Sequence, residues 1–222
     1  MLCPTCPLES PTTVQKRGNQ CAECDTTVGR RKQASEQCVK EVLIEQFQFG
    51  DIPLYTSANK PITRGGVRCN QRPDFYYDCG NFVVINEVDE GQHRWGAYNP
   101  HRELVRMDEM AKVLSVPIIF IRFNPDAFQI SGMTERVPKK QRYEMLVELL
   151  KEHLAQGSSD YLTISYLFYD QRDRLMDGEK MQYVTTKRFP TASAYKSYVD
   201  GLFPNGCADR APGTPWYTLR TT

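Results

Sequence analysis

The sequence lacks long apolar runs and has little net charge, and each absence excludes a class of protein. No apolar run approaches the roughly 20 residues that a membrane-spanning helix needs, so we expect no membrane partner. The 28 basic and 27 acidic residues leave a net charge of +1. A contact with nucleic acid therefore has to come from a local basic patch, because the chain as a whole is not basic.

The N-terminal residues also lack a secretory signal, which would show a charged stretch followed by an apolar one. We therefore expect an intracellular protein, in the cytoplasm or nucleus, that is not secreted. The chain has eight cysteines, which would suggest disulfides in an extracellular protein. In a reducing compartment, closely spaced cysteine pairs more often bind metal.

Four of these cysteines form two CxxC pairs near the N-terminus. Each pair places two thiolates on a tight turn, and two pairs complete the tetrahedron that Zn²⁺ prefers. Since the segment has few large apolar residues, the metal would supply its folding energy. We predict a structural zinc site, with a redox-active dithiol pair as the alternative. The predicted ligands are Cys3, Cys6, Cys21 and Cys24.

The hydrophobic pattern predicts an α/β domain with a mixed β-sheet core flanked by helices. Helices are expected over residues 35–49, 101–114 and 138–156, and strands over 74–79, 82–89, 117–123 and 161–170. Residues 51–71 are expected to form a loop. We predict a zinc knuckle or ribbon at 1–32, an α/β core at 33–158, and a C-terminal extension at 159–222 that packs on the core or continues it.

Acidic residues are concentrated in the two strands of "RPDFYYDCGNFVVINEVDEGQH", residues 72–93. Residues two apart in a strand point the same way, so Glu87 and Asp89 project together. The short turn between the strands brings Asp74 beside them. Converging carboxylates are costly to bury without a cation, and oxygen ligands suit Mg²⁺. His93 follows and can act as a general acid or base. Ion pairs with nearby arginines are the alternative to a metal site.

The strings "RPDF", "VVINEVDEGQH", "RELVRMDEM" and "PIIFIRFNPD" resemble the restriction-endonuclease-like nucleases of the PD-(D/E)XK superfamily. They are most similar to the branch of the very-short-patch repair endonucleases, over about residues 62–126. The resemblance implies the restriction-endonuclease-like fold, with Asp74 as the central metal ligand and Glu87 at the second acidic position. Asp89 stands where the family usually has lysine. His93 matches a histidine that takes part in catalysis in that branch.

Two further residues are candidates for the catalytic site. The first helix of the family often lends an acid, which makes Glu45 a candidate, slightly ahead of Glu41. A solvated helix face is the alternative for both. Gln92 is a candidate for orienting a water or a phosphate, with an ordinary surface glutamine as the alternative.

Together these features predict a DNA endonuclease, dependent on Mg²⁺ or Mn²⁺, that hydrolyses phosphodiester bonds. RNA is the other substrate to consider. The alternative is a catalytically inactive module on a nuclease-like fold, which binds nucleic acid or protein through the zinc knuckle. Basic residues near the acids and after the cysteine pairs are expected to contact phosphates, unless they pair with the acids. These residues are Arg30, Arg31, Lys32, Arg64, Arg68, Arg72 and Arg94.

Overall fold

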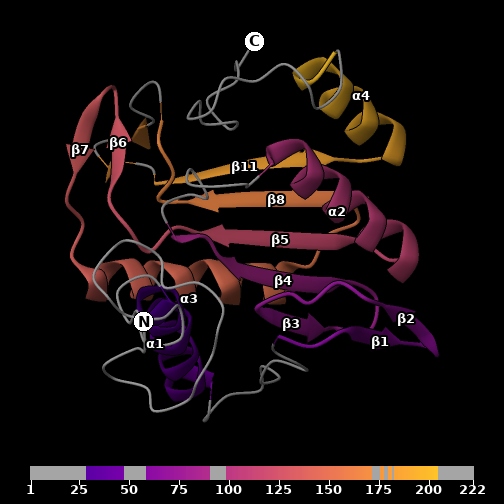
Figure 1. Ribbon diagram of the computed structural model, residues 1–222, viewed down its shortest axis with the longest axis horizontal. Coiled ribbons are helices and arrows are strands. Elements are labelled where there is room, and N and C mark those ends of the chain that lie inside the picture. Colours follow the sequence, from indigo (N-terminus) through magenta and orange to yellow (C-terminus); the bar gives the residue numbers. More distant parts are fainter. Residues whose placement is uncertain are drawn as a thin grey trace, which may run out of the picture. The chain divides into compact units, whose positions relative to one another are not determined.

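Figure 1 shows a computed structural model of the chain. It describes residues 29–47, 59–90, 99–171, 176–177, 180–181 and 183–204. The chain divides into two compact units, Met1–Val42 and Leu43–Thr222, and the boundary falls inside helix α1 (Gly29–Phe47). The four zinc-ligand candidates, Gln92, His93 and Arg94 lie outside the described residues, so the roles assigned to them remain predictions.

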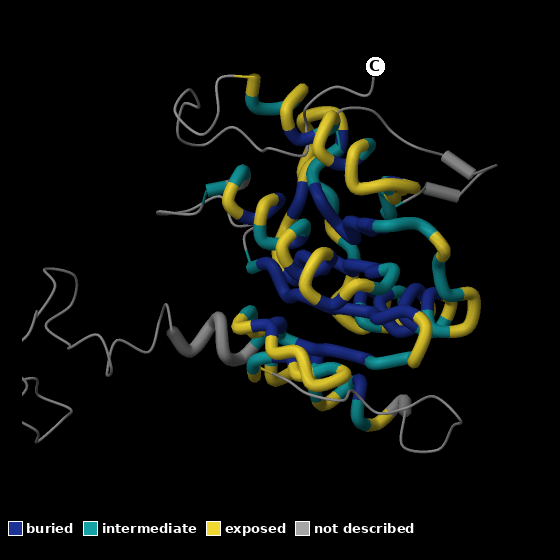
Figure 2. Tube along the Cα trace, turned by 90° about the vertical axis from the view of Figure 1, so that its right-hand side faces the viewer, coloured by how far each residue is buried: buried dark blue, intermediate teal, exposed yellow. Residues whose placement is uncertain are grey.

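The core of the second unit is a mixed five-stranded sheet with the order β11-β8-β5-β4-β3 (Figure 1). Its three central strands run parallel, and an antiparallel strand pairs at each edge. The central strands are buried at every position (Figure 2), and in β5 this burial explains a nearly continuous apolar run. The strands are β3 (Phe75–Asp78), β4 (Val83–Val88), β5 (Ile118–Phe123), β8 (Leu162–Leu167) and β11 (Val184–Phe189).

Helices cover both faces of this sheet. Successive residues of a strand point to opposite faces. On β8, Ile164 belongs to the apolar cluster that includes Leu104 of α2 (Pro100–Leu114). The next residue, Ser165, forms a 2.9 Å hydrogen bond with His153 of α3 (Lys139–Gln156). The α2 face also carries α4 (Ala192–Leu202), whose Tyr195 hydroxyl donates to the Leu104 carbonyl over 2.9 Å.

The start of α2 is fixed by a side-chain cap. Asn99 Oδ1 accepts a hydrogen bond from Arg102 N at 3.3 Å, and Pro100 occupies the start of the helix, where its missing N–H costs nothing. The helix ends at Ser115, which adopts a left-handed conformation. The cap holds the first two turns of α2 in place, and these turns carry the charged residues that contact β4 and β5.

The predicted α/β class, with a mixed sheet flanked by helices, is confirmed. Two local predictions are wrong. The first helix begins at Gly29 rather than at Ser35, because the intervening arginines, lysine, glutamine and alanine are good helix formers. Residues 51–71 are not all loop: β1 (Ile62–Arg64) and β2 (Val67–Cys69) form a hairpin. Its turn, Gly65-Gly66, has positive φ at both positions, as tight hairpin turns require.

The remaining strands are short and lie outside the five-stranded sheet. They are β6 (Phe128–Ile130), β7 (Met133–Glu135), β9 (Met176–Asp177) and β10 (Lys180–Met181). None of the helices among the described residues combines the length and apolar character that crossing a membrane would take.

Candidate functional site

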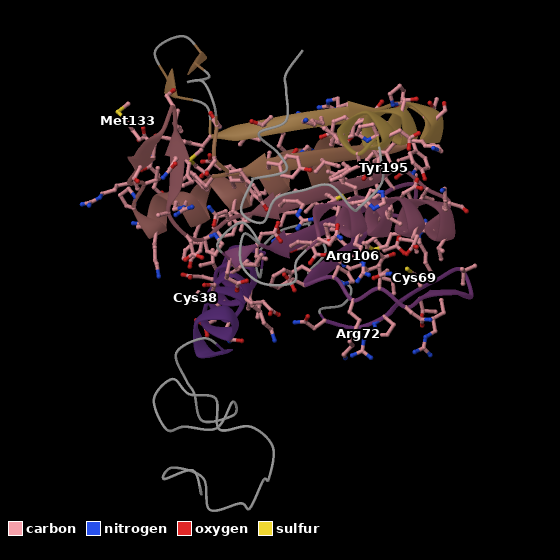
Figure 3. All side chains as sticks on the ribbon, turned by 45° about the horizontal axis from the view of Figure 1, so that its top comes forward. Cys38, Cys69, Arg72, Arg106, Met133 and Tyr195 are labelled. Carbon is pink, nitrogen blue, oxygen red and sulfur yellow. The ribbon has the colours of Figure 1, made fainter. Side chains whose placement is uncertain are left out.

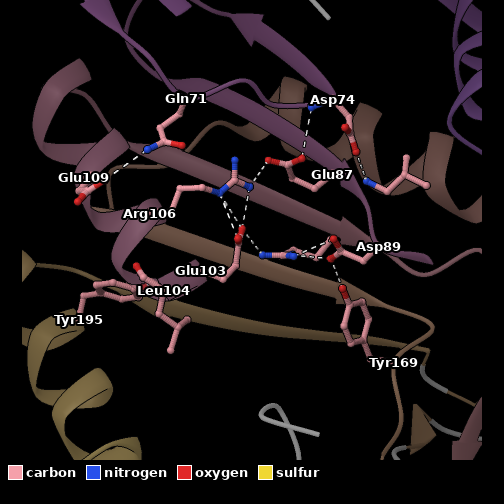
Figure 4. A network of polar contacts seen from close by, with 12 residues as sticks. Gln71, Asp74, Glu87, Asp89, Glu103, Leu104, Arg106, Glu109, Tyr169 and Tyr195 are labelled. Atoms are coloured by element: carbon pink, nitrogen blue, oxygen red, sulfur yellow. Dashed lines mark hydrogen bonds and ion pairs between the residues drawn. The ribbon is translucent and has the colours of Figure 1, made fainter. Parts of the chain in front are cut away.

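The structure places Asp74 next to Glu87 at one end of the β3–β4 pair. Phe75 lies opposite Asn86 in this antiparallel pair, so Asp74, one residue before β3, lies beside Glu87. Glu87 Oε2 accepts a 3.3 Å hydrogen bond from Asp74 N, and Asp74 Oδ2 accepts a 2.7 Å hydrogen bond from Val88 N (Figure 4). Glu87 is 6% exposed. The first two predicted acids are therefore brought together on neighbouring strands.

Helix α2 supplies the cationic partner of Glu87. Arg106 Nη2 lies 2.5 Å from Glu87 Oε1. The same guanidinium contacts Glu103, one helical turn earlier: Nε lies 3.1 Å from each carboxylate oxygen, and Nη2 lies 2.7 Å from Oε1. Arg106 therefore bridges a carboxylate of the sheet and a carboxylate of the helix (Figure 4).

Asp89 lies in a second, deeper ion pair. Arg122 of β5 holds both of its carboxylate oxygens, with Nε at 2.5 Å and Nη2 at 2.8 Å, and the Tyr169 hydroxyl donates to the same carboxylate. Arg122 Nη1 also lies 2.7 Å from Glu103 Oε1. The side chains of Asp89 and Arg122 are each 1% exposed. For Asp89 to bind a metal, a cation would have to replace this guanidinium, and its role as a ligand stays a prediction.

The two arginines do not affect the acids equally. Burial raises the pKa of Glu87 to about 8; Arg106 and Arg122 oppose the rise, while the carboxylates of Asp74 and Glu103 add to it. Burial alone would also raise the pKa of Glu103. There, however, the attraction of Arg122 and Arg106 prevails, and the pKa lies below its ordinary value. A further positive charge at the site would therefore favour the ionised form of Glu87.

The other predicted site residues are spread more widely. Glu45 is exposed on α1. Arg64 pairs with Asp78 at 3.3 Å and donates to the Gly80 carbonyl. Arg68 and Arg72 are exposed, and Figure 3 shows Arg72 directed outward while Arg106 lies against the body of the domain. The basic run at residues 30–32 belongs to α1, and its side chains lie outside the described part.

Asp74 and Glu87 are the described residues that could hold a magnesium ion, with the cation taking the place of Arg106 at Glu87 Oε1. Among the described residues, no three histidine, cysteine or acidic side chains are arranged as a complete metal site. Mg²⁺ does not require one, because it commonly binds to one or two carboxylates and completes its shell with water and substrate phosphate. Asp74 and Glu87 supply two such carboxylates side by side.

Sequence reasoning did not identify the partners of these acids, which are Glu103, Arg106, Arg122 and Tyr169. One signal was present, since Arg122 is the single charged residue in the apolar strand "PIIFIRF" and a charge there needs a buried partner. The three-residue spacing of Glu103 and Arg106 is weaker evidence of a site, because such pairs are common on solvated helix surfaces.

Comparison with known proteins identifies no relative. No protein-family model, curated protein or solved structure matches the chain.

Proposed function

We propose that the protein is a Mg²⁺-dependent DNA endonuclease with a restriction-endonuclease-like fold. The observation that supports this proposal best is the placement of Asp74 beside Glu87 at the end of two paired strands, with Glu87 almost fully buried. Oxygen ligands at such a position favour a hard divalent cation. The flanking arginines would bind phosphates of the substrate.

Hydrolysis of a phosphodiester needs an activated water and compensation for the charge that develops on the phosphate. A divalent cation supplies both when bound, because it acidifies water and neutralises charge. Asp74 and Glu87 hold it in this proposal, and His93 acts as the general acid or base. Gln92, which would orient a water or a phosphate, and Glu45, an acid lent by the first helix, complete the proposed set.

The buried ion pair of Asp89 and Arg122 has a positioning role here. It joins the end of β4 to β5, and the contact of Arg122 with Glu103 extends the connection to α2. Because Glu103 also holds Arg106, the network fixes the guanidinium that contacts Glu87. A preorganised site of this kind loses little free energy to rearrangement during the reaction.

One observation favours a second candidate function, a binding module without catalysis. Glu87, Asp89 and Glu103 all form ion pairs with arginines. Such a network is also found in proteins where the charges only join neighbouring elements. In this alternative the protein binds nucleic acid or protein through its exposed basic residues and its N-terminal cysteine pairs.

Incubation of the purified protein with nucleic acid separates the two functions. Supercoiled plasmid, single-stranded DNA and single-stranded RNA are each mixed with the protein in Mg²⁺, in Mn²⁺ and in EDTA. The endonuclease proposal predicts nicked or linear plasmid in the presence of a cation and none in EDTA. A protein that binds DNA but cuts none of these substrates with any divalent cation would be the binding module. Cleavage of RNA alone would correct the substrate class.

A further inference from the structure

Two arginines, Arg106 and Arg122, belong to this ion-pair network, and Arg106 is the one that a substrate can reach. Its side chain is 22% exposed, whereas that of Arg122 is 1% exposed. Arg122 uses Nε, Nη1 and Nη2 in its contacts with Asp89 and Glu103. Arg106 uses only Nε and Nη2, and its Nη1 forms no hydrogen bond or ion pair with any described residue. Two N–H donors of Arg106 are therefore available.

Ion pairs with Glu103 fix the orientation of the Arg106 guanidinium. Glu103 holds Nε and Nη2 of the guanidinium, and Glu103 is itself held by the buried Arg122. Glu103 is 7% exposed, so water competes little for these bonds. An arginine anchored in this way presents its remaining donors in one direction and loses little side-chain entropy when it binds an anion.

We propose that Arg106 binds the scissile phosphate of the DNA next to the cation held by Asp74 and Glu87, an inference that rests on the proposed function. One Nη1 hydrogen donates to a non-bridging phosphate oxygen, while Nε and Nη2 keep their contacts with Glu103. A guanidinium suits this task because its planar fork can bind Glu103 through Nε and Nη2 and still offer the donors of Nη1 to an anion. Its contact with Glu87 places the bound phosphate beside the cation, where the scissile bond has to lie.

This arrangement makes the phosphate contact dependent on the cation. Without the cation, Glu103 offsets the charge of Arg106, and Glu87 and the neighbouring Asp74 add further negative charge where they are ionised. A phosphate is then repelled as much as it is attracted. A bound cation compensates the carboxylates, so Arg106 can attract the phosphate. Cation and DNA should therefore strengthen each other's binding, because such coupling is reciprocal.

Two binding measurements test the proposal without relying on cleavage. The first is the anisotropy of a labelled duplex oligonucleotide titrated with protein in EDTA and in Ca²⁺, with a denaturing gel to verify that the duplex stays intact. The second is a calorimetric titration of the DNA-free protein with Ca²⁺. Both compare the wild-type protein with Arg106→Gln and with Asp74→Asn. Arg102→Gln is the matched control, because Arg102 is an exposed arginine of the same helix.

We expect Ca²⁺ to tighten the binding of the duplex to the wild-type protein and to Arg102→Gln. For Arg106→Gln the gain in affinity should be about tenfold smaller, the value of one charge-assisted hydrogen bond. In EDTA, Arg106→Gln and wild type should bind the duplex equally within about twofold, since the network offsets the charge of Arg106. The DNA-free Arg106→Gln protein should still bind Ca²⁺, because Asp74 and Glu87 are both retained.

Distinct results overturn the inference and the proposed function. A gain with Ca²⁺ that is as large in Arg106→Gln as in wild type would show that Arg106 does not hold the phosphate. If Arg106→Gln lost the same affinity for the duplex with and without Ca²⁺, the contact between Arg106 and the phosphate would not depend on the cation. If the wild-type protein does not bind Ca²⁺, or if Asp74→Asn binds it equally well, the cation site and the proposed function fail together with the inference.

A second substitution, Arg106→Lys, keeps the proposal testable if Arg106→Gln does not fold. Lysine keeps the positive charge but cannot span Glu103 and a phosphate with one planar group, so it should also lose most of the gain in affinity. Thermal unfolding of each variant establishes which proteins are folded before binding is compared. A folded Arg106→Lys protein with the full wild-type gain would show that a point charge suffices, and would contradict the proposed geometry.

Discussion

Glu87 on β4 and Arg122 on β5 occupy directly paired positions in the sheet, but each forms its ion pairs with other residues. Glu87 pairs with Arg106, whereas Arg122 pairs with Asp89 and Glu103. The arginines thus define an inner group, Arg122 with Asp89, whose side chains are each 1% exposed, and an outer group, Arg106 with Glu87, in which the arginine is 22% exposed. The inner group is expected to determine stability, and the outer group to determine the binding of cation and substrate.

Arg122→Met should destabilise the protein far more than Arg106→Met. The first change leaves the buried Asp89 without a guanidinium, while Glu103 keeps Arg106, and an uncompensated buried charge typically costs about 3–5 kcal/mol. The second leaves Glu103 still paired with Arg122, and Glu87 can bind a proton because its pKa is about 8, so its cost is smaller. Urea unfolding of both variants measures the difference, and Arg136→Met serves as the control because Arg136 is exposed. Equal losses of stability for the two network arginines would contradict the division into inner and outer groups.

The stability of the cation-free protein should fall as the pH rises, through Glu87. Its pKa in the folded protein is about 8, above the value of about 4.3 expected in the unfolded chain. Folding therefore favours the protonated form, and this contribution to stability is fully present below pH ~4 and lost as the pH rises to ~8. Unfolding free energies measured in EDTA should decline over this range less steeply for Glu87→Gln than for wild type. Parallel pH profiles would show that Glu87 titrates normally.

Mg²⁺ should stabilise the wild-type protein most clearly near pH 8. A cation that binds only the folded state raises the unfolding free energy by about 2.7 kcal/mol at a concentration 100 times its dissociation constant. Asp74→Asn removes one of the two carboxylate charges and should abolish most of this gain. The melting temperature of both proteins with Mg²⁺ and with EDTA checks this expectation. A gain of equal size in Asp74→Asn would place the cation elsewhere.

The N-terminal cysteine pairs should bind zinc. Their spacing predicts about one zinc ion per chain through Cys3, Cys6, Cys21 and Cys24, which lie outside the described residues. Elemental analysis of protein purified without added zinc measures the content directly, and Cys21→Ser should reduce it to near zero. Cys38→Ser is the control, because Cys38 is a free exposed thiol. A zinc-free protein whose N-terminal segment is still folded would favour the redox alternative.

The sequence was sufficient to predict β5 from its continuous apolar run, β8 from its alternation, and the helices α2 and α3 from their helical apolar period. The β1–β2 hairpin was missed, since three-residue strands are too short to show a period. The adjacency of Asp74 and Glu87 could be predicted from one short turn between two strands. Their pairing with α2 could not, because it depends on how a helix separated in sequence packs over β4 and β5.

Cleavage of supercoiled plasmid by wild type and by Asp74→Asn, with DNA binding measured in parallel, tests the proposed cation site most directly. Asp78→Asn is the matched control, because it makes the same change at the other end of β3. We predict that Asp74→Asn loses cleavage in Mg²⁺ but keeps most of its DNA affinity, since exposed basic residues supply the phosphate contacts, and that Asp78→Asn still cuts. Cleavage by Asp74→Asn at the wild-type rate would contradict the proposal that Asp74 and Glu87 hold the catalytic cation.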